Sequence, residues 1–188
     1  MPVKSNFAAG NILTASDTNT YLTNGGLVYI TQANVTAGNA FVTFNNCFSS
    51  TYENYRIVFR YTQASAGYPA IYFTMRTGTT NFTTNVYNYM GNGRTSANAD
   101  ASYASANSTF GYVGSLTGAM AFDLFSPFNS SAITYVTGMN AFVDAGGSTV
   151  RTVGNTVVTT QSFDGIQFST GTSTFNTGTI YIYGYRNA

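Results

Sequence analysis

The sequence contains no histidine, no tryptophan and one cysteine in 188 residues. Without histidine, the chain lacks the commonest general base and the commonest metal ligand of proteins. Hydrolases that activate a serine or a cysteine with a histidine are therefore excluded. Cys47 cannot form a disulfide within the chain, and we expect it to be a small buried hydrophobic residue. We predict a protein that is not an enzyme and that binds no cofactor and no metal.

Charge is also scarce. Charged residues make up 7 % of the chain and the formal net charge is +1, whereas ordinary soluble domains contain about 25 % charged residues. Such a chain has too little positive charge to attract nucleic acid. Its polar surface must consist of Thr, Asn, Ser and Gly, which can pack against copies of themselves without electrostatic repulsion. We therefore expect protein partners and no nucleic acid.

Long apolar runs are missing as well. None approaches the roughly 18 residues that indicate a membrane-spanning helix. The first residues, Met1 to Lys4, do not begin the apolar core of a signal peptide. We expect no membrane insertion, synthesis in a cytoplasm and release by cell lysis.

Acidic residues are too scattered to indicate a catalytic pair. A glycosidase needs two carboxylates about 5 to 9.5 Å apart. Asp123 and Asp164 are the two that a sheet could bring together, but no spacing in the sequence indicates that it does.

Aromatic residues are abundant, with 15 Tyr and 15 Phe, and this composition favours β-strands. The clearest strand is Gly178 to Arg186, in which Ile180 and Ile182 alternate with Tyr181, Tyr183 and Tyr185. We expect the isoleucines to face a core. The three tyrosines are a candidate subunit interface, with a platform for sugar rings as the alternative.

From residue 27 to residue 188 the pattern predicts one domain with nine or ten strands separated by turns. Residues 55–61 alternate like the terminal strand. We expect a bulge at Gly138 and a hairpin turn from Asp144 to Gly147. The prediction is an all-β fold, an antiparallel jelly-roll-like sandwich of about eight strands, preceded by a short N-terminal helix.

Residues 1–26 form the predicted second segment. Thr14 and Asp17 have the spacing of a capping box, and the helix that they begin ends at Asn24-Gly25-Gly26. A helix of barely two turns is not stable alone, so we expect this segment to dock on its own domain, on another subunit or on a larger assembly. The candidate docking residues are Phe7, Ile12, Leu13, Asp17, Tyr21 and Leu22.

Residues 91–108 are rich in Gly, Ser, Ala and Asn, which predicts a long surface excursion. Long loops on a rigid scaffold commonly bind ligands. We therefore expect a receptor-binding loop here, with Gly171 to Gly178 as a second loop. The candidate receptor residues are Asn92, Arg94, Asn98 and Asp100.

Two parts of the chain resemble virion proteins. Residues 7–22 resemble an N-terminal motif of tail fibres and other minor structural proteins of tailed bacteriophages: Phe, Ala-Gly, Leu-Thr-Ala, then Asn and Leu. Residues 48–59 and 178–186 are similar to a β-rich domain at the C-terminus of phage virion proteins. Together these stretches cover under a quarter of the chain. Thr18 stands where the family motif has Leu or Met, so the helix loses one apolar docking contact.

The resemblance implies a structural protein of the virion, often a homotrimer. Within that class we favour a short tail fibre or tail-tip protein whose loops attach to a host surface glycan. The alternative is a capsid decoration or head-fibre protein that contacts the major capsid protein. A third possibility is a free carbohydrate-binding module, which would be a monomer with a concave aromatic site.

Overall fold

The computed structural model describes residues 26–63, 70–95, 100–108, 111–115, 117–144, 147–171 and 173–186. The predicted N-terminal helix and its docking residues lie outside this part of the chain. Among the described residues there are thirteen β-strands and no helix. The strands are β1 (Leu27–Val35), β2 (Phe41–Phe44), β3 (Asn54–Gln63), β4 (Ala70–Thr77), β5 (Thr80–Asn81), β6 (Tyr87–Thr95), β7 (Asp100–Ser108), β8 (Gly111–Ser115), β9 (Thr117–Phe125), β10 (Thr134–Asp144), β11 (Gly147–Val157), β12 (Gly165–Ser169) and β13 (Phe175–Tyr185).

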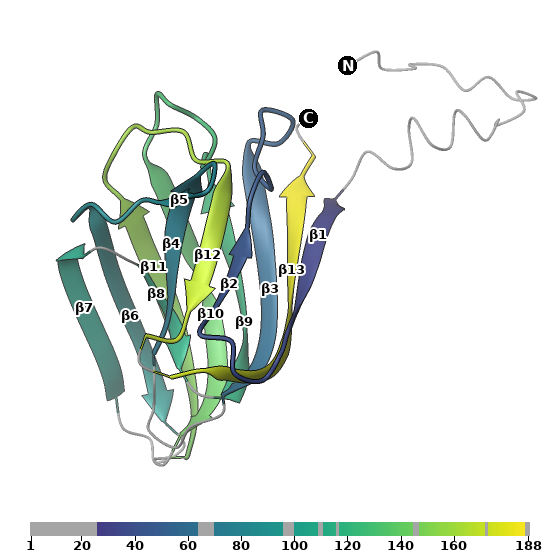
Figure 1. Ribbon diagram of the computed structural model, residues 1–188. Coiled ribbons are helices and arrows are strands. Elements are labelled where there is room, and N and C mark those ends of the chain that lie inside the picture. The colour runs from purple at the N-terminus through teal and green to yellow at the C-terminus, as the bar shows by residue number, and fades with distance from the viewer. Residues whose placement is uncertain are drawn as a thin grey trace, which may run out of the picture.

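The strands form two antiparallel sheets packed as a sandwich (Figure 1). The large sheet has eight strands in the order β1-β13-β3-β9-β10-β11-β6-β7. The small sheet has the order β2-β12-β4-β5, and β8 also pairs with β4. The predicted all-β antiparallel sandwich is confirmed, although its thirteen strands exceed the nine or ten expected from the sequence.

The core lies between the sheets and follows from the alternation in the sequence. Tyr55, Ile57, Phe59 and Tyr61 of β3 are at most 1 % exposed, whereas the intervening Arg60 is exposed. Aromatic rings join the two sheets, since Phe168 of β12 lies 5.6 Å from Phe59 and 6.0 Å from Phe122, both in edge-to-face contact. Cys47 is buried, as predicted.

The two ends of the sandwich differ in what they carry. At one end β1 begins opposite the last residue of β13, because Leu27 pairs with Tyr185. At the other end β6 ends at Thr95 and β13 begins at Phe175 (Figure 1). One continuous row of paired residues marks that second end: Val35, Gly178, Tyr61, Gly118, Phe142, Thr149 and Thr95.

The predicted long loop at residues 91–108 is wrong. β6 and β7 form an antiparallel hairpin at the edge of the large sheet, paired from Tyr87 with Ser108 to Arg94 with Asp100. Strand pairing uses backbone groups, which small residues such as Ala and Ser supply as well as large ones do. Gly178 likewise lies inside β13, so the second predicted loop is shorter than expected.

The predicted bulge at Gly138 is also wrong, while the adjacent turn is confirmed. Pairing runs without a shift through Gly138 to both β9 and β11, and Asp144 pairs with Gly147. A Cβ at Gly138 would overlap the carbonyl oxygen of Ala121 and the side chain of Phe122. Glycine is therefore needed here for a close approach of two strands.

Candidate functional site

The outward face of the large sheet carries the candidate subunit interface. Ile180 and Ile182 of β13 are fully buried, so Tyr181, Tyr183 and Tyr185 point outward, where they are half-buried. The predicted two-faced strand is confirmed. β13 lies between β1 and β3 and is not an edge strand, so its tyrosines sit within a broad sheet surface.

Tyr29 of β1 extends this group of aromatic residues. It pairs directly with Tyr183, and their rings meet edge to face at 6.1 Å. Tyr181 stacks on Tyr183 at 6.3 Å. Tyr29 is 55 % exposed, which makes it the most open ring of the cluster. We call Tyr29, Tyr181 and Tyr183 the tyrosine cluster.

Tyr185 is held by two charged residues of neighbouring strands. Its hydroxyl donates to Oδ1 of Asp123 at 2.6 Å and accepts from Nη1 of Arg56 at 3.3 Å. Arg56 forms an ion pair with Asp123 at 3.2 Å. Burial, followed by the hydrogen bond to Asp123, raises the pKa of Tyr185. This contact network ties three strands together on the outward face.

A larger exposed surface was not predicted from the sequence. Eleven large hydrophobic side chains of the described residues are exposed, and six of them project from four adjacent strands of the large sheet. We call these six the apolar face: Met90, Phe125, Tyr135, Met139, Val143 and Val150. In β10 the two alternating sets are about equally apolar, so the sequence contains no signal for which one faces the core.

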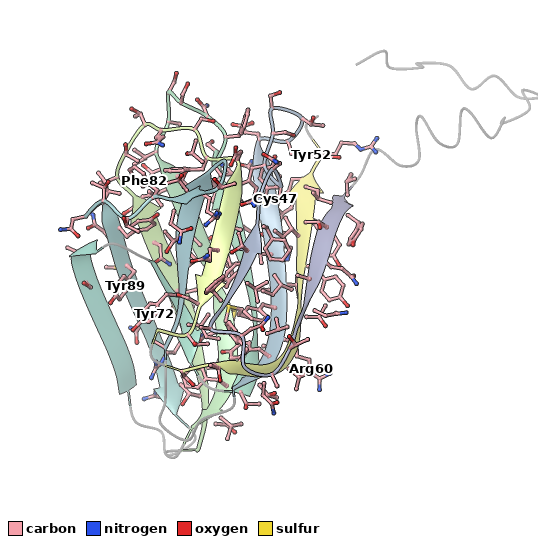
Figure 2. The ribbon with its side chains drawn as sticks, viewed as in Figure 1. Cys47, Tyr52, Arg60, Tyr72, Phe82 and Tyr89 are labelled. Atoms are coloured by element: carbon pink, nitrogen blue, oxygen red, sulfur yellow. The ribbon has the colours of Figure 1, made fainter. Side chains whose placement is uncertain are left out.

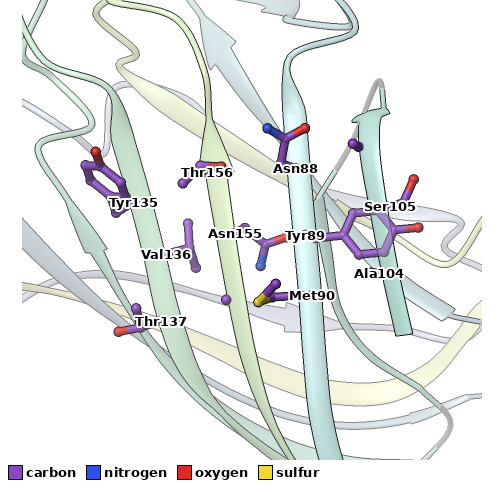
Figure 3. Close-up of a pocket in the computed structure, with 12 residues that line it drawn as sticks. Asn88, Tyr89, Met90, Ala104, Ser105, Tyr135, Val136, Thr137, Asn155 and Thr156 are labelled. Carbon is purple, nitrogen blue, oxygen red and sulfur yellow. The ribbon is translucent and has the colours of Figure 1, made fainter. Parts of the chain in front are cut away.

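Hollows lie on this surface, and two of them flank Met139. The first has a volume of about 590 Å³ and is lined by Met90, Tyr135, Thr137 and Gly154, among others (Figure 3). The second has a volume of about 770 Å³ and reaches from Arg60 and Tyr181 across Ala141 to Val143 and Val150. Small residues form the floors of the two hollows. Met139 lies in the strip of sheet that separates them, where it pairs with Ala121 of β9 on one side and with Thr152 of β11 on the other.

The candidate receptor residues do not form a loop cluster. Asn92 and Arg94 point outward from β6, and Arg94 pairs in register with Asp100, the first residue of β7. Asn98 lies outside the described residues, as do Phe7, Ile12, Leu13, Asp17, Tyr21 and Leu22. Asn92 borders a further hollow that it shares with Met90, Thr152 and Gly154.

The groups that could carry chemistry are separated. Asp123 bonds to Arg56 and Tyr185, whereas Asp164 accepts hydrogen bonds from the backbone nitrogen of Gly78 at 2.9 and 3.0 Å. Burial raises the pKa of the Cys47 thiol to about 12, which makes it a poor nucleophile. Among the described residues, no group of three or more acidic or cysteine side chains could hold a metal ion.

The described part of the chain also contains no helix that is long and apolar enough to cross a membrane. No protein-family model matches the sequence. No curated protein matches it significantly. The fold and the surface define the class of protein: an antiparallel β-sandwich with a charge-poor, apolar outward face.

Proposed function

We propose that this protein is a non-enzymatic structural protein of a tailed-bacteriophage virion. Residues 1–26 dock it to the particle, and the sandwich projects from the particle and attaches to the host surface, as a homotrimeric short tail fibre or tail-tip protein. The observation that supports this most is that the two ends of the sandwich differ: residues 1–26 lead into β1 at one end, and β6 ends and β13 begins at the other.

The antiparallel registers define these two ends. Residues 1–26 lead into β1 at Leu27, beside the last residue of β13. β6 ends at Thr95 and β13 begins at Phe175 at the opposite end. A subunit held at the first end would present the second end to its surroundings.

The side chains near that second end suit a glycan. Thr62, Thr117 and Thr177 lie near strand ends there, and the exposed guanidinium of Arg60 lies close by, far from Tyr52 (Figure 2). Hydroxyl groups bind sugar hydroxyls, and a guanidinium binds a sugar carboxylate in a fork of two hydrogen bonds. The receptor would therefore be a surface glycan, including one that carries carboxylates.

Copy number in purified particles tests the proposal. Quantitative mass spectrometry against the major shell protein should give a small fraction of the shell copy number. A ratio near one would instead identify a capsid decoration protein, and complete absence from particles would exclude both. Deleting residues 1–25 should abolish incorporation, whereas a free carbohydrate-binding module would keep its sugar binding without them.

Host attachment is measured separately, as binding of the purified protein to host cells. Arg60→Ala should reduce binding several-fold. Arg186→Ala is the matched control, because Arg186 is also exposed but follows β13 at the other end of the sandwich. Equal binding by both variants and by the unaltered protein would remove Arg60 from the receptor site.

A further inference from the structure

Two strands of the large sheet, β10 and β11, do not sort their side chains by polarity: Val136, Phe142, Val153 and Val157 are buried beside polar side chains, while other apolar side chains point outward. On β10 and β11 the inward side chains include Thr134, Asn140, Thr149 and Asn155, which are 0 to 4 % exposed. The outward side chains of the same strands include Met139, Val143 and Val150, which are 49 to 57 % exposed. A sheet with one solvated face normally turns its apolar residues inward.

Exposing this surface is unfavourable. Burial of apolar area contributes about 25 cal/mol per Å², and contiguous exposed apolar patches of this kind usually mark interaction sites. The apolar face follows β10, where Tyr135, Met139 and Val143 alternate with Thr137 and Ala141 on the outward side, and Phe125 of β9 pairs with Tyr135. This surface therefore has the properties of a contact surface.

The charge of the face indicates the kind of partner. Its outward residues on β9, β10 and β11 are Ala, Thr, Ser, Gly, Met, Val, Tyr and Phe apart from Asp123, which is paired with Arg56 at 3.2 Å. On β6 the outward residues are Asn88, Met90, Asn92 and Arg94, so Arg94 is the one cation that these four strands turn outward. A face with so little charge offers little attraction to nucleic acid or to an anionic membrane. It also offers little repulsion to another copy of itself, and the formal net charge of the whole chain is only +1.

The relief and the size of the face also fit a second copy. Met139 lies in the strip between the two hollows, so its exposed side chain in one copy can enter a hollow of another copy. The methionine side chain is flexible and adapts to such a fit. The four strands that carry the apolar face, at about 4.8 Å each and with about 9 residues at about 3.3 Å each, cover about 570 Å², and the whole eight-stranded sheet covers on the order of 1,000 Å². A standard interface buries about 800 Å² per partner, so a contact centred on the apolar face reaches that size when it includes part of the neighbouring sheet surface.

We infer that the outward face of β9, β10, β11 and β6, centred on Met139, is the surface through which copies of this chain associate. The inference deepens the proposed function by naming a second copy of this chain as the partner of the sandwich. It rests on the proposed function only in placing that contact in a virion. It also assigns the main contact to the apolar face, with the tyrosine cluster at its margin.

Three substitutions at equally exposed positions test this assignment. Met139 and Tyr29 are each 55 % exposed and Phe41, on the small sheet, is 58 % exposed. Met139→Glu would bury an unpaired charge in the contact, so its dissociation constant should rise by at least about 100-fold. Tyr29→Glu and Phe41→Glu should leave association almost unchanged.

Multi-angle light scattering over a range of concentrations measures the outcome, with circular dichroism to check folding. The inference is supported if the unaltered chain forms oligomers and Met139→Glu has a mass near 20.1 kDa. It is overturned if the unaltered chain is a monomer throughout, if Met139→Glu still associates, or if Tyr29→Glu dissociates the oligomer equally.

Methionine oxidation provides a second measurement that does not depend on the Met139→Glu variant being well folded. Met90 and Met139 are 67 % and 55 % exposed, whereas Met75 and Met120 are 0 % and 3 % exposed and serve as internal references. Dilution of the unaltered protein into its monomeric range should increase oxidation of Met90 and Met139 several-fold. Unchanged relative rates across the dissociation would overturn the inference.

These results separate the two proposals. A protein that associates through Met139 but is absent from particles would exclude the virion role and leave this inference intact. A protein that is found in particles but is a monomer at every concentration would exclude this inference and leave the virion role intact.

Discussion

Asp123 has the most specific polar contacts on the outward face. It accepts a hydrogen bond from Tyr185 at 2.6 Å and pairs with Arg56 at 3.2 Å, so one carboxylate joins β9 to β3 and β13. The site is partly exposed, which limits its contribution through solvent screening. The three residues are 62 to 129 positions apart in sequence, so only folding brings them together.

Asp123→Asn should lower the free energy of unfolding by about 1 kcal/mol, because it removes the ion pair and weakens the hydrogen bond from Tyr185. Urea denaturation measures the change. Tyr185→Phe and the double variant complete a cycle, and we expect the two effects to be less than additive. Strict additivity would show that the two side chains do not stabilise each other.

Cys47 and Tyr87 should make the protein sensitive to alkali. Burial raises the pKa of Cys47 from its ordinary value of 9.0 to about 12, and it also raises the pKa of Tyr87 well above 10.0. Both groups are neutral in the folded protein, so they contribute fully to the free energy of unfolding at any pH below the pKa of the unfolded chain. The contribution of Cys47 to the free energy of unfolding is lost as the pH rises above its ordinary pKa of 9.0, and that of Tyr87 as the pH rises above 10.0, at up to about 1.4 kcal/mol per pH unit for each group.

We therefore expect the free energy of unfolding to be level from pH 7 to 8 and to decline above pH 9. Cys47→Ala should be less stable at pH 7 but should decline less steeply between pH 9 and 10. Urea titrations at each pH measure both slopes. Identical slopes for the two proteins would show that Cys47 does not contribute.

At the scale of the strands, glycine has different roles on the two faces of the large sheet. A Cβ at Gly138 would overlap Ala121 and Phe122 of β9, whereas the nearest atom to a Cβ at Gly154 is a carbon of Met90 at 3.9 Å. Gly138 lies in the interior of the sandwich, and Gly154 lies on the floor of the first hollow. The same substitution should therefore have different effects at the two sites.

Gly138→Ala should destabilise the fold by about 1 to 3 kcal/mol, because two strands must move apart. Gly154→Ala is the matched control in the adjacent strand and should change stability by less than about 0.5 kcal/mol. Thermal unfolding of both variants measures the difference. Equal stability losses would mean that the close approach of β9 and β10 is not what requires glycine at position 138.

Strands with one strongly apolar face could be predicted from the sequence, and strands without one could not. The alternation in β3 and β13 correctly identified the buried residues Ile57 and Ile182. β7 was missed because its residues, DASYASANS, have neither an aliphatic face nor strong strand propensity. Its strand conformation depends on pairing with β6, which is a tertiary effect.

For the whole molecule, residues 27–186 should fold without the N-terminal segment. Every residue of the core cluster of the described part lies between Val35 and Ile182, and β1 pairs with β13 from Leu27 to Val35 with one register shift between Tyr29 and Thr31. A chain that begins at Gly26 should keep its melting temperature within about 2 °C, equivalent to less than about 1 kcal/mol. Differential scanning calorimetry measures this. A decrease of about 10 °C or more would show that residues 1–25 belong to the core.

The sequence alone determined the fold class, because aromatic and β-branched residues at a period of two can bury their apolar side only in packed sheets. It also determined which side of β13 faces the core, since Ile180 and Ile182 oppose a row of tyrosines. Only the tertiary structure decided which side of β10 faces the core. Both of its sides are about equally apolar, and the small sheet with β8 covers only one of them. Met139, Val143 and Tyr135 are exposed for that reason.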